Sequence, residues 1–286
     1  MRKTCIILVN YNGYKDTLEC IDSIKENISN DYKIIVVDNK STDDSLNYLK
    51  KIKDIYLIES DKNGGFSYGN NLGIKYALDN DYQNIILLNN DTVVTKDCFD
   101  KMVDLSDDKE IGIIGNKVLY YDTDKIYSYG GSINLNRGTA ILGYNQDNNK
   151  ELNDQYVSFI SGCCMLIKRE VFDKIGLLNE DYFMYYEDVD FCLNASKYFK
   201  LKVINDSVIY HKVSASTGGE ENPFAIKYNT RNRIIFMNKY CKKAKLFFYF
   251  TRIIVLLKYR LKGKKENYEA LKEGIKLGRK YINENK

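Results

Sequence analysis

The first 120 residues alternate between short apolar runs and amphipathic segments. Runs rich in Ile, Leu and Val are typical of buried strands, and apolar residues spaced three or four apart are typical of helices that pack on a sheet. Alternation of the two predicts a parallel sheet wrapped by helices. The predicted strands are residues 4–10, 33–39, 55–60 and 84–90, and the predicted helices are residues 17–28, 45–52 and 69–78.

The later part of the chain changes to strands with irregular connections, which predicts a mixed sheet. A polar stretch at residues 146–154 indicates a flexible loop near the site. We expect a helix to begin near Glu187 and Asp188, the next strand to end at His211, and the chain beyond Pro223 to be helical to its end. The further predicted strands are residues 111–121, 127–135, 157–169 and 201–211.

Composition indicates an ordinary globular protein, because 44% of the 286 residues are hydrophobic and 29% are charged. We expect one main α/β domain at residues 1–220 and a basic helical extension at residues 221–286. The charge is uneven, since residues 224–286 contain 18 Lys and Arg against 4 Asp and Glu. An anionic surface would therefore dock on the extension.

The cysteines and the N-terminus both indicate a cytoplasmic protein. The seven cysteines form no Cys-x-x-Cys pair and no metal-type spacing with the single histidine, so we expect small buried thiols in a reducing cytosol. The apolar stretch after Lys3 is about six residues long, too short for a signal peptide, and it lacks a small-residue cleavage site.

Polar side chains follow three of the predicted strands. Ligands of open α/β sheets bind at the carboxyl ends of the strands, so we expect these side chains to meet in one crevice. The residues are Asn10, Tyr11, Asn12, Asp38, Asn39, Asn89, Asn90 and Asp91.

Asp91 and His211 each have two interpretations. An aspartate after a strand can cap the next turn. It can also bind Mg²⁺ or Mn²⁺, which need few protein ligands when substrate phosphates and water complete the shell, and Asn89 is a weaker candidate ligand. A lone histidine is either a packed or surface residue, or a ligand that supplements those oxygens.

Glu187 and Asp188 lie among aromatic residues at the start of a predicted helix. Acidic residues in a first turn complement the helix dipole. A carboxylate in an aromatic, partly desolvated setting also suits removal of a proton from an acceptor hydroxyl, and either residue can fill that role.

A glycine-rich segment at residues 62–74 precedes a predicted helix. Its backbone amides can approach a diphosphate, although ordinary turns use the same residues. The segment matches neither the Walker nor the dinucleotide fingerprint, which argues against a kinase, an ATPase or a dehydrogenase.

In their order along the chain, six segments resemble the family-two glycosyltransferases of bacterial polysaccharide synthesis, especially the rhamnosyltransferase-like branch. The resemblance covers residues 4–215. The segments are IILVNYNG, VVDNKSTDDS, NGGFSYGNNLGI, LLNNDTVV, the run from Ser161 to Ala195, and VIYH.

The resemblance implies a nucleotide-sugar-binding fold of the GT-A type and a nucleotide-diphosphate-sugar donor. It implies that Asp38 reads the pyrimidine base, that the end of the first strand lines the nucleoside pocket, and that Gly162 lies where donor sugar and acceptor meet. The matching donor-site positions are Val9, Asn10, Tyr11, Asp38, Asn39, Gly65, Phe66, Asn71, Asn89, Asn90 and Gly162.

The same resemblance implies roles for three further residues. Asp91 resembles the last residue of an Asp-x-Asp metal motif, and His211 resembles a ligand of the divalent cation, Mn²⁺ or Mg²⁺. Asp188, rather than Glu187, resembles the catalytic base. Two positions depart from the family pattern. Asn89 stands in place of the leading Asp of the metal motif, and Asn70 stands where many relatives have Arg.

The expected function is that of an inverting, metal-dependent glycosyltransferase. Its best-matching donor is dTDP-L-rhamnose, and its acceptor is a cell-surface polysaccharide or a lipid-linked glycan precursor. The alternative is a catalytically silent GT-A scaffold subunit, against which the retained Asp38, Asp91, Asp188 and His211 argue. Nucleotidyl transfer expects a basic first turn, where this chain has NYNGYKD with no arginine, and nucleic acid is not an expected partner because no recognition motif is present.

The segment from Lys243 to Lys265 is too short and too charged in its apolar part to span a bilayer, which takes about 20 apolar residues. We expect an interfacial helix at the inner face of the plasma membrane, with Phe247, Phe248 and Leu256 below anionic headgroups. The alternative is a helix packed on the catalytic domain or against a second copy in a homodimer.

Overall fold

The computed structural model describes residues 3–30, 32–121, 123, 125–143, 152–213 and 222–285. Contacts between residues divide the chain into two compact units. The sheet unit comprises Met1–Ser132, Leu142–Phe183 and Glu187–Val213, and the helical unit comprises Ile133–Ile141, Met184–Tyr186 and Ser214–Lys286. Residues 144–151, most of the stretch predicted to be a flexible loop, lie outside the described residues.

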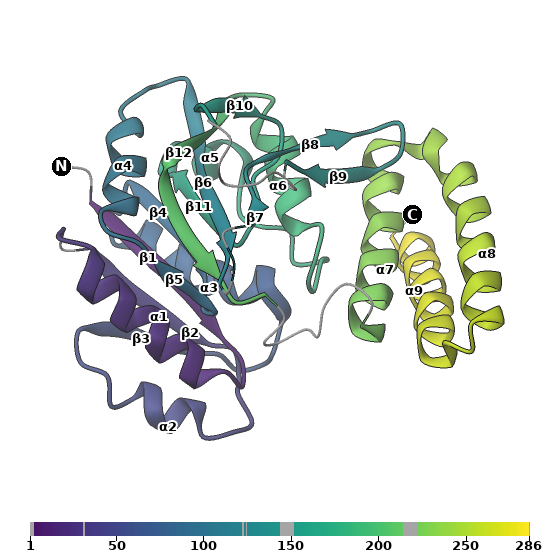
Figure 1. The fold of residues 1–286 in the computed structure, drawn as a ribbon, viewed down its shortest axis with the longest axis horizontal. Helices are drawn as coiled ribbons and strands as arrows, with labels where there is room; N and C mark the ends of the chain where they lie inside the picture. Colours follow the sequence, from purple (N-terminus) through teal and green to yellow (C-terminus); the bar gives the residue numbers. More distant parts are fainter. Residues whose placement is uncertain are drawn as a thin grey trace. The chain divides into compact units, whose positions relative to one another are not determined.

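The sheet unit alternates strands and helices as predicted (Figure 1). Its strands are β1 (Thr4–Asn10), β2 (Lys33–Asp38), β3 (Ile55–Glu59), β4 (Asn84–Asn89), β5 (Thr92–Val94), β6 (Ile111–Tyr120), β7 (Ile126–Ser128), β10 (Gln155–Val157), β11 (Cys164–Lys168) and β12 (Lys200–His211). Its helices are α1 (Tyr14–Asn27), α2 (Ser45–Leu49), α3 (Gly65–Asp79), α4 (Cys98–Leu105), α5 (Arg169–Ile175) and α6 (Glu187–Ala195). The expected start of α6 and end of β12 are confirmed.

Within the described residues, ten strands form one mixed sheet whose main path is β10-β12-β6-β11-β4-β1-β2-β3. β1 lies between β4 and β2 and is parallel to both. β11 runs antiparallel between β4 and β6, and β12 is parallel to β6. β12 therefore runs in the same direction as β4, β1 and β2, and their carboxyl ends share one edge of the sheet. This mostly parallel α/β sheet confirms the predicted fold class.

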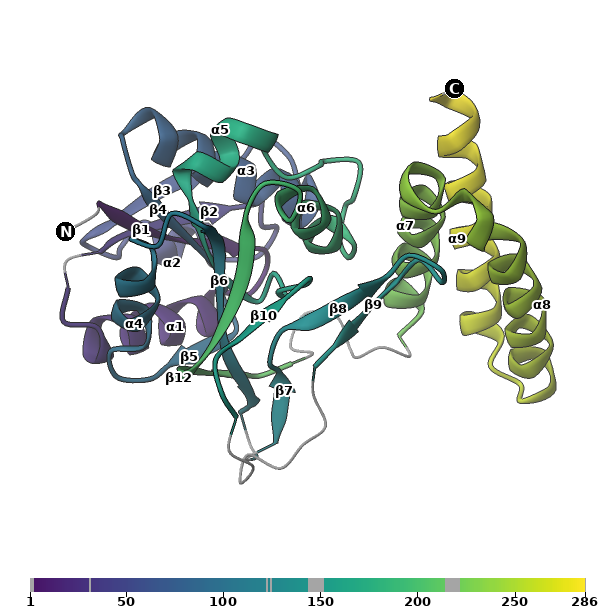
Figure 2. The ribbon, with the colours of Figure 1, turned by 90° about the horizontal axis from the view of Figure 1, so that it is seen from above.

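Helices cover both faces of the sheet (Figure 2). Because side chains alternate along a strand, neighbouring residues of β1 face different helices. Ile6 packs in one core cluster with Cys20 of α1 and Phe99 of α4. The next residue, Ile7, faces α3, where a Cβ built on Gly73 would lie 2.7 Å from Ile7 Cγ2. The sheet is therefore the buried middle layer of the unit.

The helical unit is formed mainly by the C-terminal part of the chain. Its helices are α7 (Pro223–Tyr240), the 3₁₀ turn η1 (Lys242–Ala244), α8 (Lys245–Leu261) and α9 (Lys265–Glu284). A two-stranded sheet pairs β8 (Gly131–Asn134) with β9 (Thr139–Leu142). The prediction of helices beyond Pro223 is confirmed for the described residues.

A small apolar core holds these helices together. Ile234 and Met237 of α7 pack with Ala244 and with Phe248 of α8. The expectation that Phe248 lies below lipid headgroups is wrong, because its ring fills this core and is only 1% exposed. The inner face of α8 therefore packs on α7, and a different face of the helix is open.

All seven cysteines are free thiols, and six of them are buried, as the sequence predicts. Burial raises the pKa of the Cys20 and Cys98 thiols to about 12, so both stay protonated at neutral pH. None of the helices in the described ranges is long and apolar enough to cross a membrane.

Two glycines let α9 approach α7 closely. A Cβ built on Gly274 would lie 2.5 Å from the carbonyl oxygen of Lys227, and one built on Gly278 would lie 2.9 Å from Ile234 Cβ. Any side chain at either position would have to push the helices apart.

We expect Gly274→Ala to destabilise the protein by about 1–3 kcal/mol, because the added methyl group overpacks against a backbone carbonyl. Thermal unfolding followed by circular dichroism measures the effect. Lys276→Ala, at an exposed position of the same helix, is the control and should leave the melting temperature nearly unchanged. Equal melting temperatures for both variants would contradict the close packing of α7 and α9.

Candidate active site

The carboxyl ends of β1, β2 and β4 lie side by side at one edge of the sheet. Asn10 is paired with Asp38, and Val9 is paired with Asn89. Tyr11 follows at the same edge with 43% of its surface exposed. The expectation that the polar residues after these strands meet in one place is therefore confirmed.

Asp38 is the centre of a buried polar network. Its Oδ1 accepts hydrogen bonds from Asn10 Nδ2 at 2.9 Å and from Ser41 Oγ at 2.7 Å, and its Oδ2 accepts one from the Ser41 backbone at 3.0 Å. The Thr17 hydroxyl donates to Asn10 Oδ1 at 2.8 Å and accepts from Asn90 Nδ2 at 2.9 Å. One chain of hydrogen bonds therefore joins the polar residues that follow β1, β2 and β4.

The glycine-rich segment begins α3 and is held by Asn39. The Asn39 amide donates to the Gly65 carbonyl at 3.0 Å and accepts from the Gly64 N–H at 3.3 Å. Gly65 has a φ of +81°, and a Cβ there would lie 2.0 Å from the carbonyl oxygen of Phe183, so a side chain does not fit. Phe66 N–H donates to the same carbonyl at 2.8 Å, which fixes the start of α3 against this part of the chain.

Asn71 is buried in α3, and its amide is used within the protein. Its Nδ2 donates to the Leu178 carbonyl and to Glu180 Oε1, each at 2.9 Å. Its Oδ1 accepts from Leu178 N–H at 3.1 Å. Asn71 thus anchors the loop that follows α5.

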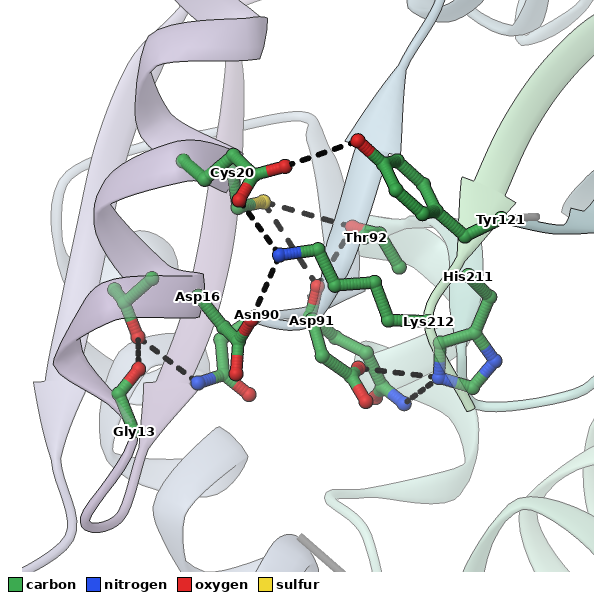
Figure 3. Close-up of polar contacts among 12 residues, drawn as sticks. Gly13, Asp16, Cys20, Asn90, Asp91, Thr92, Tyr121, His211 and Lys212 are labelled. Carbon is green, nitrogen blue, oxygen red and sulfur yellow. Dashed lines mark hydrogen bonds and ion pairs between the residues drawn. The ribbon is translucent and has the colours of Figure 1, made fainter. Parts of the chain in front are cut away.

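The connection between β4 and β5 brings Asp91 to His211. β5 pairs antiparallel with β12 and places Thr92 opposite His211. His211 Nε2 lies 3.1 Å from Asp91 Oδ1 and 3.4 Å from Asn89 Nδ2 (Figure 3). The structure therefore brings the three candidate metal ligands together.

This group of side chains fits a divalent cation. His211 Nε2 cannot donate to Asp91 and accept from Asn89 in the same tautomer. A half-turn of the Asn89 amide presents its oxygen instead, which gathers a carboxylate oxygen, an amide oxygen and an imidazole nitrogen, all suitable ligands for Mn²⁺. The distance from Asp91 Oδ1 to His211 Nε2 matches the roughly 3 Å between adjacent ligand atoms around an octahedral ion. Among the described residues no three His, Cys, Asp or Glu side chains form a metal site.

Lys212 secures the end of β12 beside this group. Its backbone N–H donates to the Asp91 carbonyl at 3.0 Å. Its Nζ lies 2.7 Å from both Asp16 Oδ1 and Glu19 Oε2 of α1 (Figure 3). The residue after His211 therefore connects β12 both to Asp91 and to the helix that follows β1.

Asp188 lies in the first turn of α6 and is held by backbone donors. Its Oδ2 accepts from Gly162 N–H at 3.0 Å, and its Oδ1 accepts from Val189 N–H at 2.8 Å. A Cβ on Gly162 would lie 3.1 Å from Phe66 Cζ and 3.5 Å from Asp188 Cβ, so the glycine leaves room for both side chains. Three candidate site residues, Asp188, Gly162 and Phe66, therefore lie together.

Burial raises the pKa of both carboxyl groups at the start of α6. For Asp188 the backbone N–H groups of Gly162 and Val189 partly offset this rise in pKa. The pKa of Glu187 is raised well above its usual value, first by burial and then by the charge of Asp188, and Glu187 Oε2 has no hydrogen-bond partner in the described part of the chain. Glu187 therefore favours its protonated form, whereas Asp188 has donors for its charged form.

The turn that precedes α6 has an uncommon backbone conformation. Tyr185 and Tyr186 have φ values of +71° and +73°, a region that costs non-glycine residues of order 1–3 kcal/mol each. Asn232 of α7 is fully buried, and its Nδ2 donates to the carbonyls of Met184 and Tyr185, each at 2.8 Å. Such strain persists only where surrounding contacts hold it, and Asn232 supplies two of them.

Four residues make contacts that the sequence motifs did not predict: Thr17, Ser41, Lys212 and Asn232. Thr17 and Ser41 follow the ends of β1 and β2 within the NYNGYKDT and VVDNKS segments, so their hydroxyl groups were a usable signal. Lys212 directly follows His211. Asn232 carries no such signal, because its partners lie far away along the chain.

The family model for glycosyl transferase family 2 matches residues 5–176, which is more than half of the chain. This protein therefore belongs to glycosyl transferase family 2, and its enzyme class is that of a glycosyltransferase. The family predicted from the sequence motifs is confirmed.

Three curated relatives align with most of the chain. The low-salt glycan biosynthesis hexosyltransferase Agl10 of Haloferax volcanii is 28% identical over 260 residues, covering 88% of this chain and 81% of that protein. The dTDP-rhamnosyl transferase RfbF of Shigella flexneri is 24% identical over 242 residues, covering 82% and 79%. The rhamnosyltransferase WbbL of Escherichia coli is 28% identical over 210 residues, covering 67% and 76%.

Solved structures of low sequence identity share the fold. The mannosyltransferase PcManGT from Pyrobaculum calidifontis, in complex with GDP-Man and Mn²⁺, has a TM-score of 0.59 at 14% identity and covers 83% of this chain and 64% of that one. GalNAc-T7 with UDP, GalNAc and Mn²⁺ has a TM-score of 0.63 at 15% identity and covers 81% and 47%. The chain thus spans less than two thirds of either solved chain. These likenesses confirm the predicted GT-A fold.

We expect Glu187→Gln to gain stability relative to the wild type as pH rises from 4.5 to neutrality. Because the pKa of Glu187 is raised above its usual 4.5 in the folded protein, the unfolded chain loses this proton while the folded chain keeps it, and wild-type stability falls. Glutamine has no proton to lose. Denaturant unfolding of both proteins across this range measures the difference.

Glu170→Gln, at an exposed carboxyl group, is the control for this comparison. A stability difference between Glu187→Gln and the wild type that stays constant with pH would contradict a buried, protonated Glu187.

Proposed function

We propose that this glycosyltransferase moves L-rhamnose from dTDP-rhamnose, with inversion and with the help of a divalent cation, onto a cell-surface polysaccharide or a lipid-linked glycan precursor. The observation that carries the proposal is the meeting of Asp91, His211 and Asn89 at the sheet edge that also holds the Asp38 network. Relatives named as rhamnosyltransferases support the choice of sugar.

The backbone links the proposed base to the proposed metal ligands. Asp188 accepts from Gly162 N–H at 3.0 Å, and the carbonyl of the next residue, Cys163, accepts from Asn89 N–H at 2.8 Å. Two consecutive residues directly before β11 thus contact the proposed base and the proposed ligand Asn89. This connection supports a donor that lies between them, with its diphosphate near Asp91 and its sugar near Gly162.

On the donor side, the Asp38 network and the exposed Tyr11 suit a nucleoside. Asp38 and Asn10 supply polar groups fixed by hydrogen bonds, and the Tyr11 ring supplies a flat face at the same edge. Asn39 keeps the start of α3 in place at the same edge of the sheet. A bound Mn²⁺ or Mg²⁺, held by Asp91 and His211 with Asn89 as a weaker ligand, would neutralise charge on the departing diphosphate.

On the acceptor side, we assign Asp188 as the base that takes the proton of the attacking hydroxyl. Burial raises the pKa of its carboxyl group, which makes its carboxylate a stronger base. The N–H groups of Gly162 and Val189 fix the direction of that carboxylate. Attack on the anomeric carbon from the face opposite the leaving diphosphate inverts the configuration.

We further propose that residues 1–220 act as the catalytic domain and residues 221–286 as an extension, at the cytoplasmic face of the plasma membrane. The buried free thiols and the excess of Lys and Arg in the extension support this location.

We expect Asp188→Asn to lower the transfer rate by about 10²- to 10⁴-fold while donor affinity changes little, because only proton removal is lost. Release of dTDP and formation of the rhamnosylated product measure transfer, and calorimetry measures donor binding. Asp181→Asn, at an exposed position in the same part of the chain, is the control. Near-normal transfer by Asp188→Asn would refute the assignment of the base, and a wild type that neither transfers nor hydrolyses a donor would favour the scaffold alternative.

We expect Asp91→Asn to weaken Mn²⁺ binding by about tenfold or more in the presence of dTDP, because a neutral amide replaces a charged ligand. Calorimetric titration with Mn²⁺ measures this affinity. Asp22→Asn removes an exposed carboxylate on α1 and is the charge-matched control. Equal Mn²⁺ affinities for the two variants would place the cation elsewhere.

A further inference from the structure

α8 carries a stripe of large apolar side chains that the rest of the structure leaves open. Every member is more than half exposed, although residues of this kind are usually buried. The members recur at helical spacing and so share one face. This α8 stripe consists of Leu246, Phe250, Ile253, Ile254, Leu257 and Leu261.

The stripe is not needed to complete the core of the helical unit. On the opposite face of α8, Phe248 already packs with Ile234 and Met237 of α7. α9 in turn packs tightly on α7 through Gly274 and Gly278. A contiguous apolar face of this size beside a finished core marks an interaction surface.

The segment that carries the stripe is rich in cations. Residues 242–265 contain nine Lys and Arg and no Asp or Glu. Lys258 follows Leu257 and Arg260 precedes Leu261, and since successive residues are about 100° apart, these two cations lie on opposite edges of the stripe. Both are exposed, and neither has an ion-pair partner among the described residues.

The neighbouring helix α9 shows the usual arrangement on a solvated surface. Its lysines are interspersed with glutamates, as in the pair of Lys272 and Glu269, whose charged atoms lie 3.3 Å apart. α8 differs from α9 in this respect, because Lys245–Leu261 contains no Asp or Glu.

The cations beside the stripe distinguish between two possible partners, a second copy of this chain and a membrane. A second copy of this chain would bring the same cations against one another, with no carboxylate between them, and like charges at an interface are unfavourable. An anionic phospholipid surface offers both an apolar layer for the stripe and phosphates for the cations at its edges.

We propose that the α8 stripe docks on anionic phospholipid membranes, with Phe250 and Leu257 in the boundary between headgroups and acyl chains and with Lys258 and Arg260 on lipid phosphates. The stripe shares no residue with the candidate active site, so the proposal holds whichever donor the enzyme uses. Of the three residues expected to lie below the headgroups, Phe247 is 57% exposed and Leu256 is half-buried, and only Phe248 is ruled out by its burial in the core.

Flotation of the full chain with phospholipid vesicles tests the proposal. We expect the wild type to float with vesicles of phosphatidylcholine and phosphatidylglycerol and to bind vesicles of pure phosphatidylcholine more weakly. High salt should reduce binding to the anionic vesicles, because it screens the attraction between the cations of α8 and the lipid phosphates. F250D combined with L257D should reduce the partition coefficient by at least about tenfold, and K258Q and R260Q should each reduce it about fivefold.

Tyr156→Asp is the matched control, because it places the same charge on a side chain of similar exposure, 57%, in the sheet unit. Its vesicle binding should equal that of the wild type. The proposal is overturned if the wild type stays with the unbound fraction in the presence of anionic vesicles, or if the double variant floats equally well. It is also overturned if sedimentation shows that the wild type is a dimer, that F250D combined with L257D is a monomer, and that neither protein binds the vesicles. Donor hydrolysis by the same variants reports on the active site separately.

Discussion

The parallel pairing of β4, β1 and β2 is the constraint on which the site depends. Parallel strands place their carboxyl ends at one edge of a sheet, and a slip of one residue would turn every side chain to the other face. The observed register sets Asn10 beside Asp38 and Val9 beside Asn89. Since β12 runs in the same direction, it delivers His211 to the same edge, where the chain after β4 supplies Asp91.

Two adjacent carboxyl groups acquire different properties from their surroundings. Desolvation raises the pKa of each, but Asp188 accepts from the N–H groups of Gly162 and Val189, whereas Glu187 Oε2 has no hydrogen-bond partner among the described residues. A pair of titratable groups whose environments differ in this way is characteristic of acid and base assignments in enzymes. The preference for Asp188 as the proposed base thus has a physical reason that is independent of the family resemblance.

Apolar periodicity predicted the strands and helices of the first 90 residues, and the rule that strand ends bind ligands grouped Asp38, Asn89 and Asp91. The elements β5, α4 and α5 were not predicted, and the strand predicted at residues 157–169 is divided between β10 and β11. What could not be predicted depends on contacts between distant segments. One example is the pair of hydrogen bonds from Asn232 to the turn before α6. Another is the burial of Phe248, because an amphipathic pattern does not say which face of a helix packs inside.

The central claim is that Asp91, His211 and Asn89 hold a cation for a nucleotide-sugar donor. A thermal-shift panel of nucleotide sugars, each with Mn²⁺ and with a chelator, tests it most directly, because a ligand that binds only the folded state raises the melting temperature. We expect a rise in melting temperature with dTDP-rhamnose that depends on Mn²⁺. No rise with any nucleotide sugar, or the same rise with the chelator, would contradict it.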